Sequence, residues 1–233
     1  MASWWERFRR RTPKGGSDIG STVVIGLGRF GGQVAESLER LGHEVLAIDS
    51  DPVVVQRWAD LLTHVVETDA TDETALGQLG VGEFARAVVG IGGEIDASLL
   101  TVLALVDVGV QEIWAKAITV KHGRILQRIG AHHVVYPELA MGERVAHMVS
   151  AKMIDFIQFD DDYAIAKTRA PAEAAGQTLA ETALRTRYGI TVVGVKRPGQ
   201  DFTHALPDTM VQRGDLLIVS GPTDLVEKFA ATT

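Results

Sequence analysis

Residues 22–31 read Thr-Val-Val-Ile-Gly-Leu-Gly-Arg-Phe-Gly, the most informative segment of the chain about its fold. An apolar, β-branched run typical of a buried strand leads into Gly26, Gly28 and Gly31, and helical spacing of apolar residues follows. In such a loop the first glycine makes a tight turn, the second lets the backbone approach a phosphate, and the third lets helix and strand pack closely. Free N–H groups and the helix dipole then favour nucleotide phosphates.

The same alternation of strand and helix continues outward from this stretch. Apolar runs predict further strands over 44–48, 64–66, 85–91, 113–117 and 133–136. Helical spacing, turn residues and a first-turn proline predict helices over 29–41, 52–61, 72–79, 96–108 and 121–129. Six strands that alternate with helices indicate an α/β fold with a Rossmann-like, doubly wound parallel sheet.

A long helical segment over 137–156 follows the last of these strands, with no further strand for it to lead into. It is either a crossover or dimer-forming element or a helix packed on its own sheet. Beyond it, strands over 163–168, 190–195 and 216–220 and helices over 179–186 and 223–230 predict a small α/β lobe. We therefore expect a basic tail and linker over 1–20, a nucleotide-binding domain over 21–137, a crossover helix and hinge over 138–158, and the small C-terminal lobe over 159–233.

Composition and charge narrow the classes of function. The chain has no cysteine, which excludes disulfides, thiolate metal sites and cysteine nucleophiles. Its net charge is −7 although residues 1–16 are basic, and an acidic body argues against nucleic-acid binding. The longest apolar stretch, 99–110, is much shorter than the ~20 residues of a spanning helix, so a membrane role would need a separate partner. The basic, aromatic start is either a solubilising tail or a contact for a membrane surface or partner.

Two residues indicate which nucleotide the loop holds. Asp49 ends the second strand, where a carboxylate can accept hydrogen bonds from both ribose hydroxyls and would repel a 2′-phosphate, so NADP is disfavoured. Arg29 lies inside the loop, where a guanidinium can reach terminal phosphate oxygens. Because a dinucleotide offers only a bridging pyrophosphate, Arg29 favours ATP or ADP over NAD(H). The alternative for Arg29 is a solvated arginine at a helix start.

Three further acids and bases follow strand ends. Asp69 is placed to accept a hydrogen bond from the adenine amino group, or else Asp69 or Thr71 caps the next helix. Lys116 ends the fifth strand and can face phosphate, whereas Glu138 would repel phosphate unless a cation lies between them. From spacing alone, Glu138 is better explained as a first-turn helix acid. The seven histidines show no metal-ligand spacing, and no nucleophile–base arrangement is evident.

At these residues the chain resembles the KtrA/TrkA family, the cytosolic RCK (regulator of K⁺ conductance) subunits of bacterial potassium uptake systems. The resemblance runs over about 22–229. Its most specific motifs are VIGLGRFGG at 24–32, GHEVLAID at 42–49, IWAKA at 113–117, IGA at 129–131 and PELAMG at 137–142. Weaker matches are RYGI at 187–190 and DLLIV at 215–219. The tail before Asp18 departs from the family pattern.

The resemblance implies a non-enzymatic regulator that gates a potassium channel or transporter through ATP or ADP. It implies an RCK N-lobe, a crossover helix and a C-lobe, assembled as dimers into an octameric ring on the cytoplasmic face of a membrane partner. It makes Glu138 part of a site for a divalent cation or sodium, and it raises cyclic di-AMP as a C-lobe ligand. The alternatives are an NAD(H)-binding redox sensor or a small NAD-dependent oxidoreductase, although the C-terminal part lacks an evident acid–base residue. The candidate binding residues are Gly26, Gly28, Arg29, Phe30, Gly31, Asp49, Ser50, Asp51, Asp69, Ala70, Lys116 and Glu138.

Overall fold

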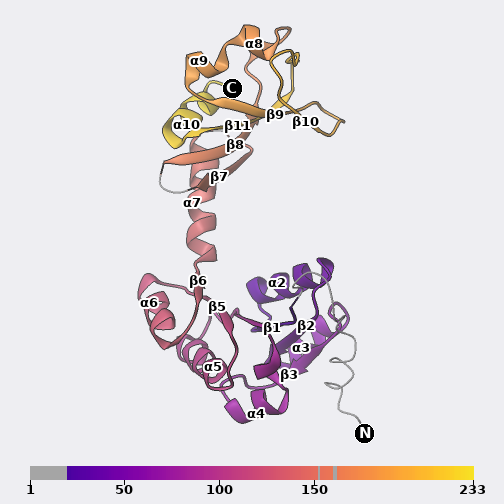
Figure 1. Cartoon of the computed structure of the whole chain (residues 1–233), viewed down its shortest axis with the longest axis vertical. Coiled ribbons are helices and arrows are strands. Elements are labelled where there is room, and N and C mark those ends of the chain that lie inside the picture. The colour runs from indigo at the N-terminus through magenta and orange to yellow at the C-terminus, as the bar shows by residue number, and fades with distance from the viewer. Residues whose placement is uncertain (1–19, 152, 160–161) are drawn as a thin grey trace. The chain divides into compact units, whose positions relative to one another are not determined.

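The structure, a computed structural model, describes residues 20–151, 153–159 and 162–233 (Figure 1). The chain divides into two compact units, residues 1–138 and 139–233, which are described separately. The predicted basic tail and two residues of the acidic run at 160–162 lie outside the described residues. Within the described ranges, no helix combines the length and the hydropathy that crossing a membrane requires.

The first unit is built on a six-stranded, entirely parallel sheet in the order β3-β2-β1-β4-β5-β6. Its strands are β1 (Thr22–Ile25), β2 (Val45–Asp49), β3 (Val65–Glu67), β4 (Arg86–Val89), β5 (Glu112–Lys116) and β6 (His133–Val135). Its helices are α2 (Arg29–Arg40), α3 (Pro52–Ala59), α4 (Glu73–Gln78), α5 (Ile95–Asp107) and α6 (Val120–Ile129), with a 3₁₀ turn at Val81–Glu83. This order confirms the predicted doubly wound sheet, in which the order of the strands reverses between β1 and β4.

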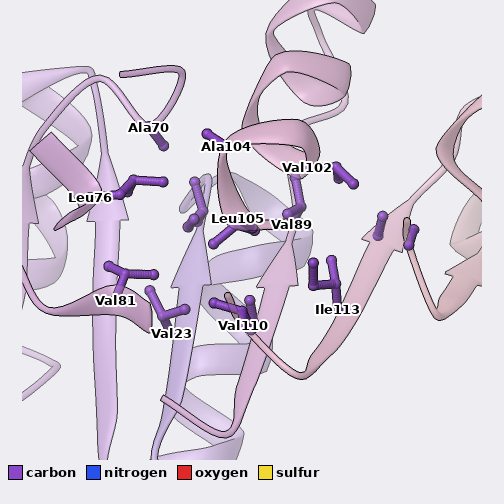
Figure 2. Close-up of a cluster of buried hydrophobic side chains, with 14 of the residues drawn as sticks. Val23, Ala70, Leu76, Val81, Val89, Val102, Ala104, Leu105, Val110 and Ile113 are labelled. Carbon is purple, nitrogen blue, oxygen red and sulfur yellow. The ribbon is translucent and has the colours of Figure 1, made fainter. Parts of the chain in front are cut away.

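Two apolar layers hold the sheet between helices. The larger layer joins β1, β4 and β5 to α4, α5 and α6, and its fully buried side chains include Leu126. Figure 2 shows part of this layer, with Leu76 and Leu105 labelled. The smaller layer packs α2 and α3 on the other face, around Ala35 and Trp58. Full burial of a leucine side chain contributes about 1.5–3 kcal/mol relative to exposure, so these layers fix the sheet and with it the carboxyl ends of the strands.

The second unit is an antiparallel sheet in the order β10-β9-β11-β8-β7. Its strands are β7 (Asp155–Phe159), β8 (Tyr163–Arg169), β9 (Thr191–Lys196), β10 (Phe202–His204) and β11 (Leu216–Pro222). Its helices are α8 (Leu179–Thr182), α9 (Leu184–Tyr188) and α10 (Thr223–Ala231), with a 3₁₀ turn at Ala172–Ala174. Phe156, Leu184 and Phe229 are buried in its core. The expected small lobe is therefore present.

The helix α7 (Pro137–Ser150) is shorter than predicted. The helix expected to reach Phe156 ends at Ser150, and Asp155–Phe159 instead forms β7 at the edge of the second sheet. Phe156 is 2% exposed while Ile157 is 49% exposed, which is the alternation of a strand and not of a helix. The expected hinge over 138–158 thus contains most of a strand.

The second unit differs from the predicted secondary structure in two smaller ways. The helix expected over 179–186 is divided into α8 and α9 at Ala183, whose φ of 49° lies in the left-handed region that interrupts a helix. The short strand β10 was not predicted, because its three residues carry no apolar alternation.

Candidate nucleotide-binding site

A groove of about 250 Å³ lies at the carboxyl ends of β1, β2, β3 and β4, around the point where the strand order reverses between β1 and β4. Ligands of open α/β sheets bind at this kind of position. The groove is lined by Ile25, Gly26, Gly28, Asp49, Ser50, Thr68, Asp69, Ala70, Thr71, Gly90, Ile91, Gly92, Gly93, Glu94, Ala97 and Thr101. Six of the candidate residues are therefore gathered here from three separate segments, at the ends of β1, β2 and β3.

The three loop glycines each meet the physical requirement expected of them. Gly26 has a φ of 85°, which favours glycine. A Cβ on Gly31 would lie 1.9 Å from the Gly26 carbonyl oxygen, so only glycine lets α2 begin this close to the loop. A Cβ on Gly28 would meet nothing within 4 Å, which leaves open space where a phosphate would approach. Gly28 is the N-cap of α2 and supplies no side chain to the first-turn N–H groups.

Leu27, inside this loop, is held from both sides. Its N–H donates to Oδ2 of Asp49 at 2.6 Å, and its carbonyl oxygen accepts from the indole Nε1–H of Trp58 at 2.8 Å. The Trp58 ring also packs where a Cβ on Gly32 would sit, 2.0 Å from Cζ2. The glycine loop is thus shaped by α3 and by the end of β2 before any ligand binds.

Asp49 therefore has a structural role beyond the ribose contact expected of it. Its Oδ1 accepts from the backbone N–H of Asp51 at 2.9 Å. A carboxylate offers about four lone-pair positions, so two backbone donors leave room for ribose hydroxyls in the groove. The Asp51 side chain caps α3 by accepting from Val53 N–H at 2.8 Å, and its contact with nucleotide stays a prediction.

Asp69 holds a turn at the base end of the groove. It accepts from the backbone N–H and the hydroxyl of Thr71, at 2.9 and 2.8 Å, and these two hydrogen bonds lower its pKa below the ordinary value. The carboxylate is therefore ionised near neutral pH and can still accept from an amino group. The alternative that Asp69 or Thr71 caps the next helix is wrong, because Asp72 caps α4 through Thr74 N–H.

Lys116 and Glu138 lie together at the ends of adjacent strands. The Lys116 ammonium donates to Glu138 Oε1 at 2.5 Å, and this hydrogen bond lowers the pKa of Glu138. The lysine side chain is 11% exposed and its Nζ lies 5.8 Å from the centre of the Phe30 ring. A Cβ on Gly92 would be 2.9 Å from that Nζ, so the ammonium borders the groove wall.

This pairing bears on the expected cation site. The positive charge beside Glu138 is a lysine of the same chain, and the exposed Arg29 adds a smaller favourable field that also lowers the pKa of Glu138. No group of three or more metal-ligating acids and histidines occurs within residues 20–151, 153–159 and 162–233. A cation at Glu138 therefore stays a prediction, and within these ranges Glu138 belongs to no group of three or more such side chains.

Sequence reasoning missed one wall of the groove, residues 90–94. Gly90 packs against the glycine loop, and a Cβ there would be 2.8 Å from the Gly26 carbonyl oxygen. The signal was available, since Gly90, Gly92 and Gly93 follow a buried strand just as the first glycine loop does. Ala97 and Thr101 on α5 were also missed, because nothing in a helix sequence shows which face lines a groove.

The fold and the site define a class: two-unit proteins whose first unit is a Rossmann-like domain with a groove at the carboxyl ends of its parallel strands. Comparison with known proteins specifies it further. The family model for the TrkA-N domain matches residues 22–137, and that for the TrkA-C domain matches residues 165–232. The chain is 38% identical to Ktr system potassium uptake protein C of Bacillus subtilis, over 89% of this chain and 94% of that protein. It is 35% identical to Ktr system potassium uptake protein A of Vibrio alginolyticus, over 87% and 92%.

The chain therefore belongs to the family of Ktr system potassium uptake proteins with TrkA-N and TrkA-C domains. Among solved structures, the GsuK channel bound to NAD shares the fold, with a TM-score of 0.64 and 21% identity. The match covers 100% of this chain but only 43% of the channel chain. The structure of GsuK bound to ADP matches with a TM-score of 0.50 and 19% identity, over 65% of this chain and 41% of that one.

Proposed function

We propose that this protein is a regulatory subunit that gates a membrane potassium channel or transporter through ADP or ATP bound in the groove at the end of β1. The observation that carries the proposal is the glycine loop, which Asp49 and Trp58 hold open at the N-terminus of α2. Two relatives that match nearly end to end are named for potassium uptake, which supplies the process being regulated.

The choice of nucleotide rests on charge at the loop. Arg29 is exposed at the first position of α2 and is available to a phosphate chain, whereas Lys116 borders the groove but is paired with Glu138. The preference between nucleotides therefore depends mainly on Arg29, and a terminal phosphate gains more from its guanidinium than a bridging pyrophosphate does. The shared fold has been solved with NAD and with ADP, so NAD is the competing ligand and NADP is disfavoured by Asp49.

The proposed partner is a membrane subunit, with this protein at the cytoplasmic face. Several apolar side chains of α7 are exposed, among them Leu139 at 54% and Val149 at 76%, as expected if α7 joins copies of the chain into a dimer and a larger ring. Cyclic di-AMP binding by the second unit is carried over from the family resemblance alone.

A second candidate, an NAD(H)-responsive sensor or small oxidoreductase, is favoured only by the NAD-bound relative. Mass spectrometry of the nucleotide that co-purifies, followed by calorimetry with ADP, ATP, NAD and NADH, separates the candidates. We expect ADP and ATP to bind more tightly than NAD. Tighter NAD binding, together with a change in NADH absorbance on adding substrates, would replace the regulatory proposal with the second.

A further inference from the structure

A buried hydroxyl without a partner lies in the wall of the groove. Thr101 on α5 is 0% exposed, and its Oγ1 makes no hydrogen bond. A helical threonine commonly donates to a carbonyl one turn earlier, and Thr101 does not. Buried polar groups are nearly always paired, so an unpartnered hydroxyl beside a groove calls for a partner from the groove.

The surroundings of Thr101 identify the part of a nucleotide that would lie there. Thr101 lines the groove together with Ala70 and Ala97, which offer flat apolar contact. Phosphates belong at the glycine loop and ribose at Asp49, so this end is left for the base. Asp69 at the same end is an ionised acceptor.

These groups together match one kind of base. Adenine presents an amino donor beside a ring-nitrogen acceptor, whereas guanine presents a carbonyl acceptor beside a ring N–H. An ionised Asp69 favours the amino group and disfavours the carbonyl. A hydroxyl can then donate to the ring nitrogen of adenine.

We infer that Thr101 selects the base of the bound nucleotide, its hydroxyl donating to a ring nitrogen of adenine. This inference rests on the proposed function, because it assumes that a nucleotide occupies the groove. It assigns to α5 a specificity-determining residue, with Thr101 as the donor in the part of the groove that Ala70 and Ala97 also line.

The test combines Thr101→Val with a matched control in the same helix. Ser98 is also 0% exposed with an unpartnered hydroxyl, but it does not line the groove among the described residues. Thr101→Val should leave the melting temperature of the ligand-free protein unchanged or raised, since it removes a buried unpaired polar group. It should also weaken ADP binding roughly three- to tenfold, the range for one neutral hydrogen bond. Ser98→Ala should match it in stability and keep the wild-type ADP affinity.

Calorimetry with 1-deaza-, 3-deaza- and 7-deaza-ADP identifies the ring nitrogen. Wild type should bind one of the three more weakly than ADP, and Thr101→Val should bind that analogue and ADP equally. Unchanged ADP affinity in Thr101→Val, equal losses in Ser98→Ala, or equal discrimination by wild type and variant would each overturn the inference and leave the proposed function standing. A wild-type protein that binds no adenine nucleotide would overturn the proposed function itself.

Discussion

The backbone N–H of Leu27 donates a 2.6 Å hydrogen bond to the carboxylate of Asp49, so the residue expected to hold the ribose also holds the glycine loop. The two residues come from the ends of neighbouring parallel strands, β1 and β2. A ligand that bridges them therefore meets a loop whose shape is already set, and less of its binding free energy is spent on ordering the loop.

Asp49→Ala should weaken ADP and ATP by similar amounts, about 1–3 kcal/mol, because both the ribose acceptor and the anchor of the loop are removed. It should also lower the free energy of unfolding. The control is Asp72→Ala, which removes the cap of α4 and should cost about 1 kcal/mol of stability without affecting affinity. Calorimetry that finds wild-type affinity in Asp49→Ala would refute the ribose assignment.

Trp58→Phe tests the loop from its other side. The indole N–H that donates to the Leu27 carbonyl would be lost while most of the packing on Gly32 is kept. Trp58 does not line the groove among the described residues. We expect calorimetry to show weaker ADP binding, and we expect the free energy of unfolding to fall by about 1 kcal/mol. Because Trp58 is not among the described lining residues, weaker binding would show that it acts through the shape of the loop. If affinity stays at the wild-type value while stability falls, Trp58 is a packing residue only.

Arg29→Ala should weaken ATP more than ADP, since only ATP offers an outermost phosphate to a guanidinium at the start of α2. Arg29 is exposed, so its removal should leave the melting temperature almost unchanged. Affinities for both nucleotides at one salt concentration provide the comparison. Equal losses would mean that Arg29 contacts the shared phosphates or none.

Glu138→Gln tests the expected cation site. If Glu138 binds a divalent ion, Mg²⁺ should tighten ATP in the wild type, and the variant should lose this coupling. Lys116→Met is the comparison variant, because it removes the lysine that pairs with Glu138 and keeps the Glu138 carboxylate. If Mg²⁺ tightens ATP equally in wild type and Glu138→Gln, the lysine alone balances the charge of Glu138 and no metal site exists there.

His122 predicts a pH dependence of stability. It is 2% exposed in the first turn of α6, and burial lowers its pKa below the ordinary value of 6.5. The folded protein then binds fewer protons than the unfolded chain, so stability is full above pH 6.5 and is lost as the pH falls below it. His122→Gln should make the fall in melting temperature between about pH 7.5 and 5.5 shallower. Identical slopes for the two proteins would show that other groups control acid stability.

The secondary structure of the first unit was predictable because the spacing of its apolar residues and the positions of its turn residues indicate the same boundaries. The apolar runs over 22–25, 44–48 and 85–91 end at Gly26, Asp49 and Gly92, and Pro52 begins its helix as expected. The end of α7 was not predictable, because Met153 and Phe156 are buried and fit the apolar spacing of a helix as well as that of a strand. Only the burial of Phe156 against the second sheet, a contact distant in sequence, decides for β7.

The loops that form the candidate site could be predicted from the sequence, but the contacts between its side chains could not. Strand order alone brings Lys116 and Glu138 to one edge of the sheet, as their positions suggested. The ion pair between Lys116 and Glu138 depends on how far the two side chains extend, which their spacing in the sequence does not show. The buried hydroxyl of Thr101 is likewise a property of packing, and no motif in the sequence signals it.

Glu138 is the last residue of the first unit, and it lies in the opening turn of the helix that continues into the second. This turn therefore holds both the partner of the Lys116 ammonium and the segment of chain that joins the two units. We expect selection on ligand preference and selection on the connection between units to act on the same few codons. Drift should be slower in this turn than at the exposed positions further along α7.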